Sequence, residues 1–320
     1  MKYLVTGGCG FIGRNLCIRL LKDPDNEIVV FDNFSTSSDV DLFSALYASG
    51  VSHEAVGRVA VIMGDILDAD RLAQGATGAD CIVHLAANTG VAPSVADPHM
   101  DCRVNVMGTL NALEAARHAG VKRFVFASSG APVGDNPPPI HEEMAPRPAS
   151  PYGASKLAGE GYCSAYWRCF GVETVALRFG NVYGPLSTHK ASVVAKFIKA
   201  AMTGERWEIY GDGGQTRDFI FIDDLVDAVL AAATRDGVAG EIFQIATAKE
   251  TTVNELALAL TQAFISAGLQ APEIVNSERR AGDVMRNFSD TSKARKMLGW
   301  QARTPLKAGL DATLRWFLSA

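Results

Sequence analysis

The sequence predicts an α/β fold, a doubly wound parallel sheet with a smaller domain toward its C-terminal end. Across the first 180 residues, short β-rich runs alternate with helical patterns, which is typical of a parallel sheet wound on both faces. These runs are apolar almost throughout, as expected for strands that are buried on both faces. The length of 320 residues suggests about two domains.

The predicted elements follow from these runs in order. We expect six strands, at residues 2–6, 27–32, 58–64, 81–85, 123–128 and 174–179. Helical patterns lie between them, at residues 11–22, 97–119 and 152–170. Seven of the 13 prolines fall between Pro132 and Pro151, and a proline-dense connection in a compact domain is more typical of an active-site loop than of a linker.

After residue 179 the segments shorten and turn signals multiply, which indicates a second domain. Residues 219–245 read as strand, helix and strand, and are regular enough to return to the sheet. The first domain is therefore predicted to comprise residues 1–180 and about 219–247. The second is predicted to comprise residues 181–218 and about 248–320.

Composition excludes several classes of protein. Thirty basic against 35 acidic residues give a net charge of −5, which argues against binding nucleic acid or a membrane surface. The six cysteines contain no C-x-x-C pair, so we expect free thiols and no metal site. No signal-peptide core and no apolar run near 18 residues is present, so the expected location is the cytoplasm.

A glycine-rich turn follows the first predicted strand. Residues 6–13 read TGGCGFIG, and glycines at 7, 10 and 13 permit a tight turn, close approach to a pyrophosphate and close helix packing. The amides at the start of the next helix would point at the phosphates. Asp32 ends the second strand 19 residues after Gly13, where a carboxylate accepts hydrogen bonds from ribose hydroxyls. The pattern predicts a dinucleotide site that prefers NAD to NADP, although Asp32 alone could be a turn residue or a helix cap.

A tyrosine and a lysine lie four residues apart at the start of a predicted helix. Tyr152 and Lys156 would share one helix face. A cation about 4 Å from the phenol, at an effective dielectric near 20, is worth roughly 4 kcal/mol. That corresponds to a lowering of the phenol pKa by up to about three units, which would make Tyr152 a usable base. The alternative is a pair of surface neighbours. Ser128 and Ser129 end the fifth strand, where a hydroxyl could bind the oxygen that Tyr152 deprotonates.

Together these motifs resemble the extended short-chain dehydrogenase/reductases, and within them the UDP-galactose (UDP-sugar) 4-epimerases. The resemblance runs from residue 2 to residue 316. Further motifs that carry it are DNFST at 32–36, GDI at 64–66, HLAA at 84–87, LRFGNVYGP at 177–185, YGDGGQTRDF at 210–219 and RRAGDV at 279–284.

The resemblance implies a Rossmann-type NAD-binding domain, a nucleotide-sugar-binding domain, and roles for individual residues. The catalytic trio would be Ser129, Tyr152 and Lys156. NAD would be bound by Gly7, Gly10, Phe11, Ile12, Gly13, Asp32, Asn33, Ser35, Asp65, Ile66, Leu85, Ala86, Ala87, Asn105 and Lys156. The UDP-sugar would be bound by Ser128, Asn181, Val194, Tyr210, Arg217, Arg280, Asp283 and Asn287.

The implied activity is 4-epimerisation of a UDP-hexose through a transient 4-keto sugar, in a homodimer formed by the helices at 97–119 and 152–170. Related dehydratases and decarboxylases carry an acidic residue after the catalytic hydroxyl, whereas this chain has Gly130 and Ala131, which favours epimerisation. A dehydratase, decarboxylase or reductase, or an NAD-binding sensor without turnover, remains an alternative. Asn287 lies where side-chain size controls space for an N-acetyl group, so hexose, N-acetylhexosamine and uronic acid stay open. Pro132 and Val133 depart from the usual Val-Tyr of the family.

Overall fold

A seven-stranded parallel sheet organises the protein. The computed structural model describes residues 1–190, 192–278 and 285–319. The sheet order is β11-β6-β5-β4-β1-β2-β3, so the winding direction reverses between β1 and β4. The strands are β1 (Lys2–Thr6), β2 (Glu27–Asp32), β3 (Val59–Met63), β4 (Cys81–His84), β5 (Arg123–Ser129), β6 (Glu173–Phe179) and β11 (Glu241–Ile245). The predicted fold class is confirmed, and each of the six predicted strands is present to within a residue at either end.

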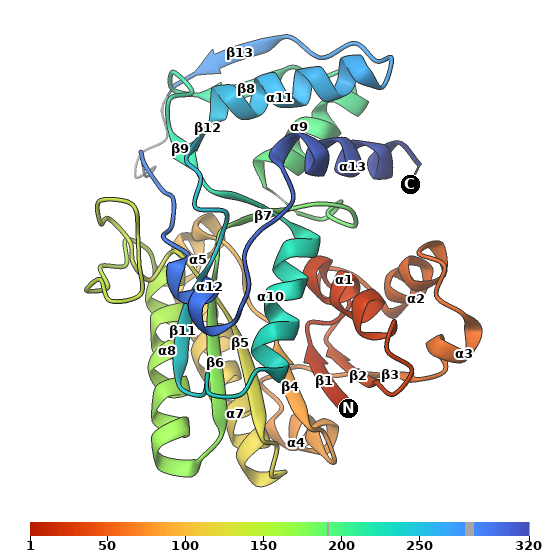
Figure 1. Cartoon of the computed structure of the whole chain (residues 1–320), viewed down its shortest axis with the longest axis vertical. Helices are drawn as coiled ribbons and strands as arrows, with labels where there is room; N and C mark the ends of the chain where they lie inside the picture. The colour runs from red at the N-terminus through yellow and green to blue at the C-terminus, as the bar shows by residue number, and fades with distance from the viewer. Residues whose placement is uncertain (191, 279–284, 320) are drawn as a thin grey trace.

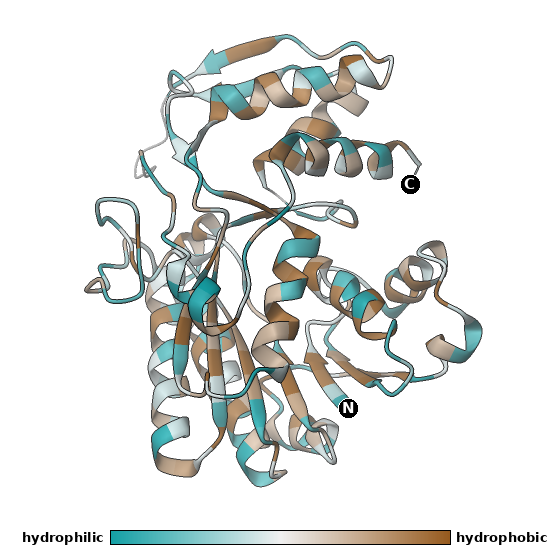
Figure 2. Cartoon of the chain, in the orientation of Figure 1, coloured by the Kyte–Doolittle hydropathy of each residue, from teal (hydrophilic) through white to brown (hydrophobic). Residues whose placement is uncertain are grey.

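Helices cover both faces of the sheet (Figure 1). One face is covered by α1 (Phe11–Leu20), α2 (Asp39–Ala48) and α10 (Ile222–Thr234). The other is covered by α4 (Ala69–Ala76), α7 (Gly108–His118) and α8 (Pro151–Phe170). The strands are among the most hydrophobic parts of the chain in Figure 2, because both of their faces are packed against these helices. A short helix, α3 (His53–Val56), precedes β3.

Local sequence sets the bounds of α8. The Ser150 hydroxyl accepts a hydrogen bond from the Gly153 amide at 3.1 Å, and Pro151 occupies the first turn, where it sacrifices no helical hydrogen bond. The helix ends at Gly171, whose φ of +73° is readily adopted only by glycine. Tyr152 and Lys156 therefore lie in the first two turns of a firmly capped helix.

The helix expected at 97–119 is divided into three consecutive segments. These are α6 (Pro98–Cys102), a π-helical segment η1 (Arg103–Met107) and α7. The wider turn accommodates Asn105, whose buried side chain is hydrogen-bonded to Asn88, Asp101 and Ser155. Such π segments recur at functional sites. The short helix α5 (Val91–Ala96) precedes α6 and packs against it.

A second group of elements lies beyond the carboxyl edge of the sheet, at the top of Figure 1. It contains α9 (Val193–Met202), α11 (Val253–Ser266), α13 (Leu306–Ser319), and the paired strands β8 (Trp207–Tyr210) and β13 (Ile274–Ser277). Two further pairs connect the groups: β7 (Asn181–Tyr183) with β10 (Phe219–Phe221), and β9 (Thr216–Arg217) with β12 (Thr251–Thr252). The helix α12 (Ser292–Met297) packs near β11. The segment 219–245 thus returns to the sheet through β11, whereas β10 pairs with β7. The domain boundaries stay a prediction.

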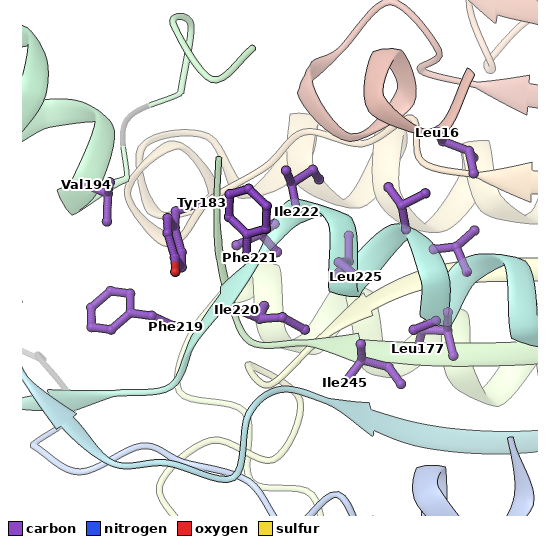
Figure 3. Packing of buried hydrophobic residues seen from close by; sticks show 14 of the residues in the cluster. Leu16, Leu177, Tyr183, Val194, Phe219, Ile220, Phe221, Ile222, Leu225 and Ile245 are labelled. Atoms are coloured by element: carbon purple, nitrogen blue, oxygen red, sulfur yellow. The ribbon is translucent and has the colours of Figure 1, made fainter. Parts of the chain in front are cut away.

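One apolar core runs from the sheet into this second group. Figure 3 shows Leu177 of β6 and Ile245 of β11 packed below Leu225, with the core continuing through Tyr183 toward Val194 of α9. Within the described ranges, none of the helices combines the length and apolar composition that a membrane span requires. All six cysteines are free thiols, of which Cys102 and Cys169 are exposed.

Candidate active site

The glycine turn between β1 and α1 lies at the carboxyl edge of the sheet, beside the reversal of strand order. Gly7 has a φ of +69°, and a Cβ there would lie 2.7 Å from the Ala86 amide nitrogen. A Cβ on Gly13 would lie 2.5 Å from the Gly8 Cα. Gly10 caps α1 without any side-chain hydrogen bond, and the first turn holds no acidic residue. The helix start, with Phe11 and Ile12, therefore offers its amides to an external anion.

Asp32 closes the next strand beside this turn. Its carboxylate accepts hydrogen bonds from the Cys9 amide at 3.0 Å and from the Phe34 amide at 2.9 Å. Burial raises the pKa of this carboxyl, and the amide hydrogen bonds oppose the rise. These bonds fix the carboxylate against the turn, in the position that a ribose diol requires.

The remaining predicted cofactor residues follow the neighbouring strands. Asn33 donates to the Asp65 carboxylate at 3.0 Å, and Ser35 donates its amide to the Asn33 side chain at 3.1 Å, which joins the loops after β2 and β3. Buried Ile66 comes directly after Asp65. Half-buried Leu85, Ala86 and Ala87 continue from β4. The carboxyl ends of β1 to β4 are thus lined by the predicted residues, and this arrangement fits NAD.

Tyr152 of α8 meets Ser129 at the end of β5. The Ser129 side chain lies close enough to the Tyr152 phenol to act on its pKa, and the Ser129 hydroxyl accepts a hydrogen bond from the Ala131 amide at 3.2 Å. Lys156 lies one turn further along α8 and is only 3% exposed. Its ammonium donates to the Ala127 carbonyl at 2.9 Å and lies 5.9 Å from the centre of the Tyr152 ring. The structure therefore brings the three predicted catalytic residues together.

The electrostatics of this trio differ from the sequence-based expectation. Burial raises the pKa of Tyr152 to about 12, an effect that the neighbouring Ser129 side chain opposes. Burial also lowers the pKa of Lys156 to about 8. The prediction that Lys156 brings the phenol pKa down is wrong for the protein atoms alone. The Lys156 ammonium donates to a strand carbonyl, and desolvation of the phenolate is the largest effect on the Tyr152 pKa.

Ser128 points away from the trio. It is 3% exposed, and its hydroxyl donates to the Glu160 carboxylate at 2.6 Å. Glu160 also accepts two hydrogen bonds from the Arg178 guanidinium, both at 2.8 Å. Successive residues of a strand face opposite sides of the sheet, so Ser129 and Ser128 cannot both face the cleft. The structure places Ser128 in a buried ion-pair network that joins β5, β6 and α8, rather than beside a substrate.

The other predicted substrate residues lie in the second group of elements and in the segments that connect it to the sheet. Asn181 is exposed on β7, and Arg217 lies on β9, where it donates to the Thr216 carbonyl at 2.7 Å. The Asn287 amide donates to the Thr216 hydroxyl at 3.3 Å, so Asn287 lies beside Arg217. Tyr210 ends β8, and Val194 is the second residue of α9, with its side chain in the core. Arg280 and Asp283 lie outside the described residues.

One buried acid near the trio was missed by the sequence reasoning. Asp101 of α6 is 1% exposed and accepts a hydrogen bond from the Asn105 amide at 2.8 Å. Its position four residues before Asn105 on a helical pattern was a usable signal, because residues four apart share a helix face. Its charge acts on both Tyr152 and Lys156.

The fold and the site define a dinucleotide-dependent enzyme of the short-chain dehydrogenase/reductase type. The sequence profile of the NAD dependent epimerase/dehydratase family matches residues 3–246. The chain belongs to this family, which uses NAD as its cofactor.

Comparisons with individual proteins agree over the whole chain. UDP-glucose 4-epimerase of Mycolicibacterium smegmatis is 39% identical over 322 residues, covering 99% of this chain and 98% of its own. The structure of UDP-N-acetylglucosamine 4-epimerase from Methanobrevibacter ruminantium superposes with a TM-score of 0.89 at 29% identity, covering 99% and 98%. That of UDP-glucuronic acid 4-epimerase from Bacillus cereus, in complex with UDP-glucuronic acid and NAD, gives 0.89 at 30% identity, covering 100% and 99%.

Proposed function

We propose that the protein is an NAD-dependent UDP-sugar 4-epimerase. The observation that carries the proposal is the placement of Ser129, Tyr152 and buried Lys156 together at the end of β5, which only β4 separates from β1 and the turn that fits NAD. The two residues that follow Ser129, Gly130 and Ala131, carry no carboxylate at the place where related dehydratases have an acid for eliminating water. Relatives that epimerise three different UDP-sugars support the same reaction.

Each residue of the trio has a distinct task in this proposal. Tyr152 takes the proton from the C4 hydroxyl of the sugar, and Ser129 holds that oxygen by a hydrogen bond. Lys156 supplies positive charge behind the phenol. The glycine turn and Asp32 would hold NAD, which would supply reversible hydride transfer at C4. Tyr152 then returns its proton after the 4-keto sugar has presented its other face.

The 4-keto sugar can present its other face only if its ring is loosely held while the diphosphate of the UDP-sugar stays bound. We assign binding of the diphosphate to Arg217 and Asn181, because a guanidinium and an amide can both donate hydrogen bonds to diphosphate oxygens. Val194 would contribute through the backbone at the start of α9, and Tyr210 through the end of β8. Arg280 and Asp283 join this group on the resemblance alone. Asn287, next to Arg217 in the structure, would border the sugar.

The proposal extends to the domains, the location and the assembly of the protein. The sheet and its helices form the NAD-binding domain, and the second group of elements forms the nucleotide-sugar domain. The protein acts in the cytoplasm, consistent with six free thiols. It forms a homodimer through the helices at residues 97–119 and 152–170, where Met107, Tyr162, Trp167 and Phe170 are exposed apolar side chains.

Replacing Tyr152 tests the mechanism. Tyr152→Phe should bind UDP-sugar and NAD nearly as well as the native protein while turnover falls by about 10²-fold or more, as expected for loss of a general base. Calorimetry measures binding, and NMR of the sugar ring protons measures turnover with UDP-glucose, UDP-N-acetylglucosamine and UDP-glucuronic acid in parallel. Tyr162→Phe, on the exposed side of the same helix, is the matched control and should retain full activity. Unchanged turnover in Tyr152→Phe, or no product from any sugar with the native protein, would contradict the proposal.

A further inference from the structure

Asp101 is a buried carboxylate with a defined place beside the catalytic helix. The short helix α6 packs against α8, η1 and α5. Asp101 accepts from the Asn105 side-chain amide at 2.8 Å, and the same amide donates to the Ser155 hydroxyl at 3.2 Å. Ser155 precedes Lys156 on α8. The carboxylate is therefore joined through a single amide to the residue adjacent to the catalytic lysine.

The titratable groups around the lysine come from three elements. Asp101 approaches from α6, whereas Glu160 and Cys163 lie on α8 itself, and all three raise the pKa of Lys156 against the effect of burial. His84 of β4 lies behind the lysine, and burial together with the charge of Lys156 lowers the pKa of this histidine to about 3. Glu160 already holds Arg178 in a bidentate ion pair, so its negative charge is largely compensated.

Fewer titratable groups surround Asp101 than surround Lys156. From α8 it faces Tyr152 and Lys156, on which its charge acts. The helix α5 contains no titratable residue, and the one charged residue of η1, Arg103, is exposed. The carboxylate and the ammonium are thus opposite charges within one buried region, where electrostatic interactions are stronger than in water.

We propose that Asp101 is a positioning residue of the active site: its buried carboxylate, held by Asn105 and joined through that amide to Ser155 of α8, fixes the surroundings of Lys156 and Tyr152. The inference rests on the proposed function of the trio. An acid at this place has two opposing effects. It favours the charged lysine, which assists catalysis, and it disfavours the phenolate until a positive charge is bound nearby. Removing the carboxylate should therefore lower the pKa of both Tyr152 and Lys156.

The test compares neutral variants of Asp101 with a control on the same helix. Asp101→Asn and Asp101→Ser both remove the charge, and the two replacement side chains differ in size and shape. Asp97→Asn removes the same charge from an exposed residue and retains the N-cap of α6, because asparagine caps helices as well as aspartate. Asp101→Glu keeps the charge and should return the titration toward that of the native protein.

Two readouts are needed. The first is the near-ultraviolet absorbance of tyrosinate in the NAD complex as a function of pH, with the Tyr152→Phe titration subtracted. Both neutral variants should ionise Tyr152 at a pH lower by about one unit than the native protein does. The second is the pH profile of kcat/KM, in which both limbs should move to lower pH. The Asp97→Asn protein should match the native protein in both.

The outcomes separate this inference from the proposed function. A neutral variant that loses activity while its tyrosinate titration and both limbs stay in place would show a purely structural role and overturn the inference. If the native protein epimerised no UDP-sugar, the proposed function would fail, yet the tyrosinate titration would still report whether Asp101 acts on Tyr152.

Discussion

Burial of a charged ammonium group destabilises a folded protein, and Lys156 carries such a group. Its pKa falls from 10.5 to about 8 because burial disfavours the charged form. The unfolded chain therefore binds more protons than the folded one between these two pKa values, so this residue makes stability rise with pH across that interval. Below about pH 8 its destabilising effect is complete.

Lys156→Met should consequently stabilise the protein while abolishing its activity. At pH 7 we expect a gain of about 1–3 kcal/mol in the free energy of unfolding, since methionine fills the site without a charge. The gain should shrink as the pH rises from about 8 to 10.5. Urea denaturation of the native and variant proteins at a series of pH values measures the difference. A variant that is less stable at pH 7 would argue that the ammonium is well compensated in place.

The sequence predicted which residues carry the reactive groups better than it predicted the environment of each group in the fold. The spacing of Tyr152 and Lys156 predicted one helix face, which the structure contains. The direction of the phenol pKa was wrong, because it depends on the desolvation of Tyr152 and on Asp101, which lies 51 residues earlier in the chain. Ser128 and Ser129 are alike in sequence, and only the register of β5 against the sheet decides which of them meets Tyr152.

At the scale of elements, the glycine turn and α1 act as one unit. A Cβ on Gly13 would meet the Gly8 Cα at 2.5 Å and two backbone oxygens at 2.6 Å, none of which can move without displacing the turn. Gly13→Ala should therefore weaken NAD binding by about 10-fold or more, equivalent to a loss of about 1.4 kcal/mol, and should lower stability. Calorimetric titration with NAD and thermal denaturation provide the two measurements.

The matched control is Gly161→Ala in α8. This helical glycine has nothing within 4 Å of an added Cβ. Alanine there should stabilise the protein by about 1 kcal/mol because it loses less backbone entropy, and NAD affinity should not change. Equal effects of the two substitutions would mean that the close approach at Gly13 is not what the turn requires.

Helices and strands were predictable where the apolar pattern is strong. They were less predictable where a single contact determines the type of helical turn or the strand partner. The pattern over 97–119 indicated one helix and could not indicate the π-helical turn, which depends on Asn105 reaching Asn88 and Ser155 from another part of the chain. The strand β10 was expected in the sheet because residues 219–245 read as a regular strand, helix and strand. It pairs instead with β7, and only β11 reaches the place beside β6.

At the scale of the whole molecule, the order of the strands places the site without any further information. Right-handed crossovers between parallel strands put β1 beside β4, and ligands of such sheets bind where the order reverses. The second group of elements was harder to predict. Its short strands pair across long stretches of sequence, as β8 does with β13, and carry weak patterns.

Assembly is the last property at this scale. Met107 of η1 and Tyr162 of α8 are exposed apolar side chains on the helices expected to form the homodimer. A homodimer would cover them, and a carboxylate at either place would then be buried without a partner. The Met107→Glu, Tyr162→Glu double variant should shift the protein from dimer to monomer at micromolar concentration, as measured by light scattering.

The control for this shift places the same charges on another apolar surface. Leu258 and Ile265 of α11 are also strongly exposed, at 61% and 57%. The Leu258→Glu, Ile265→Glu double variant adds the same net charge but lies away from α7 and α8, so it should remain dimeric. A monomeric native protein would remove the dimer from the proposal, and dissociation of the α11 variant alone would place the interface on the second group of elements. Retained NAD binding in both variants would show that any change of mass is not unfolding.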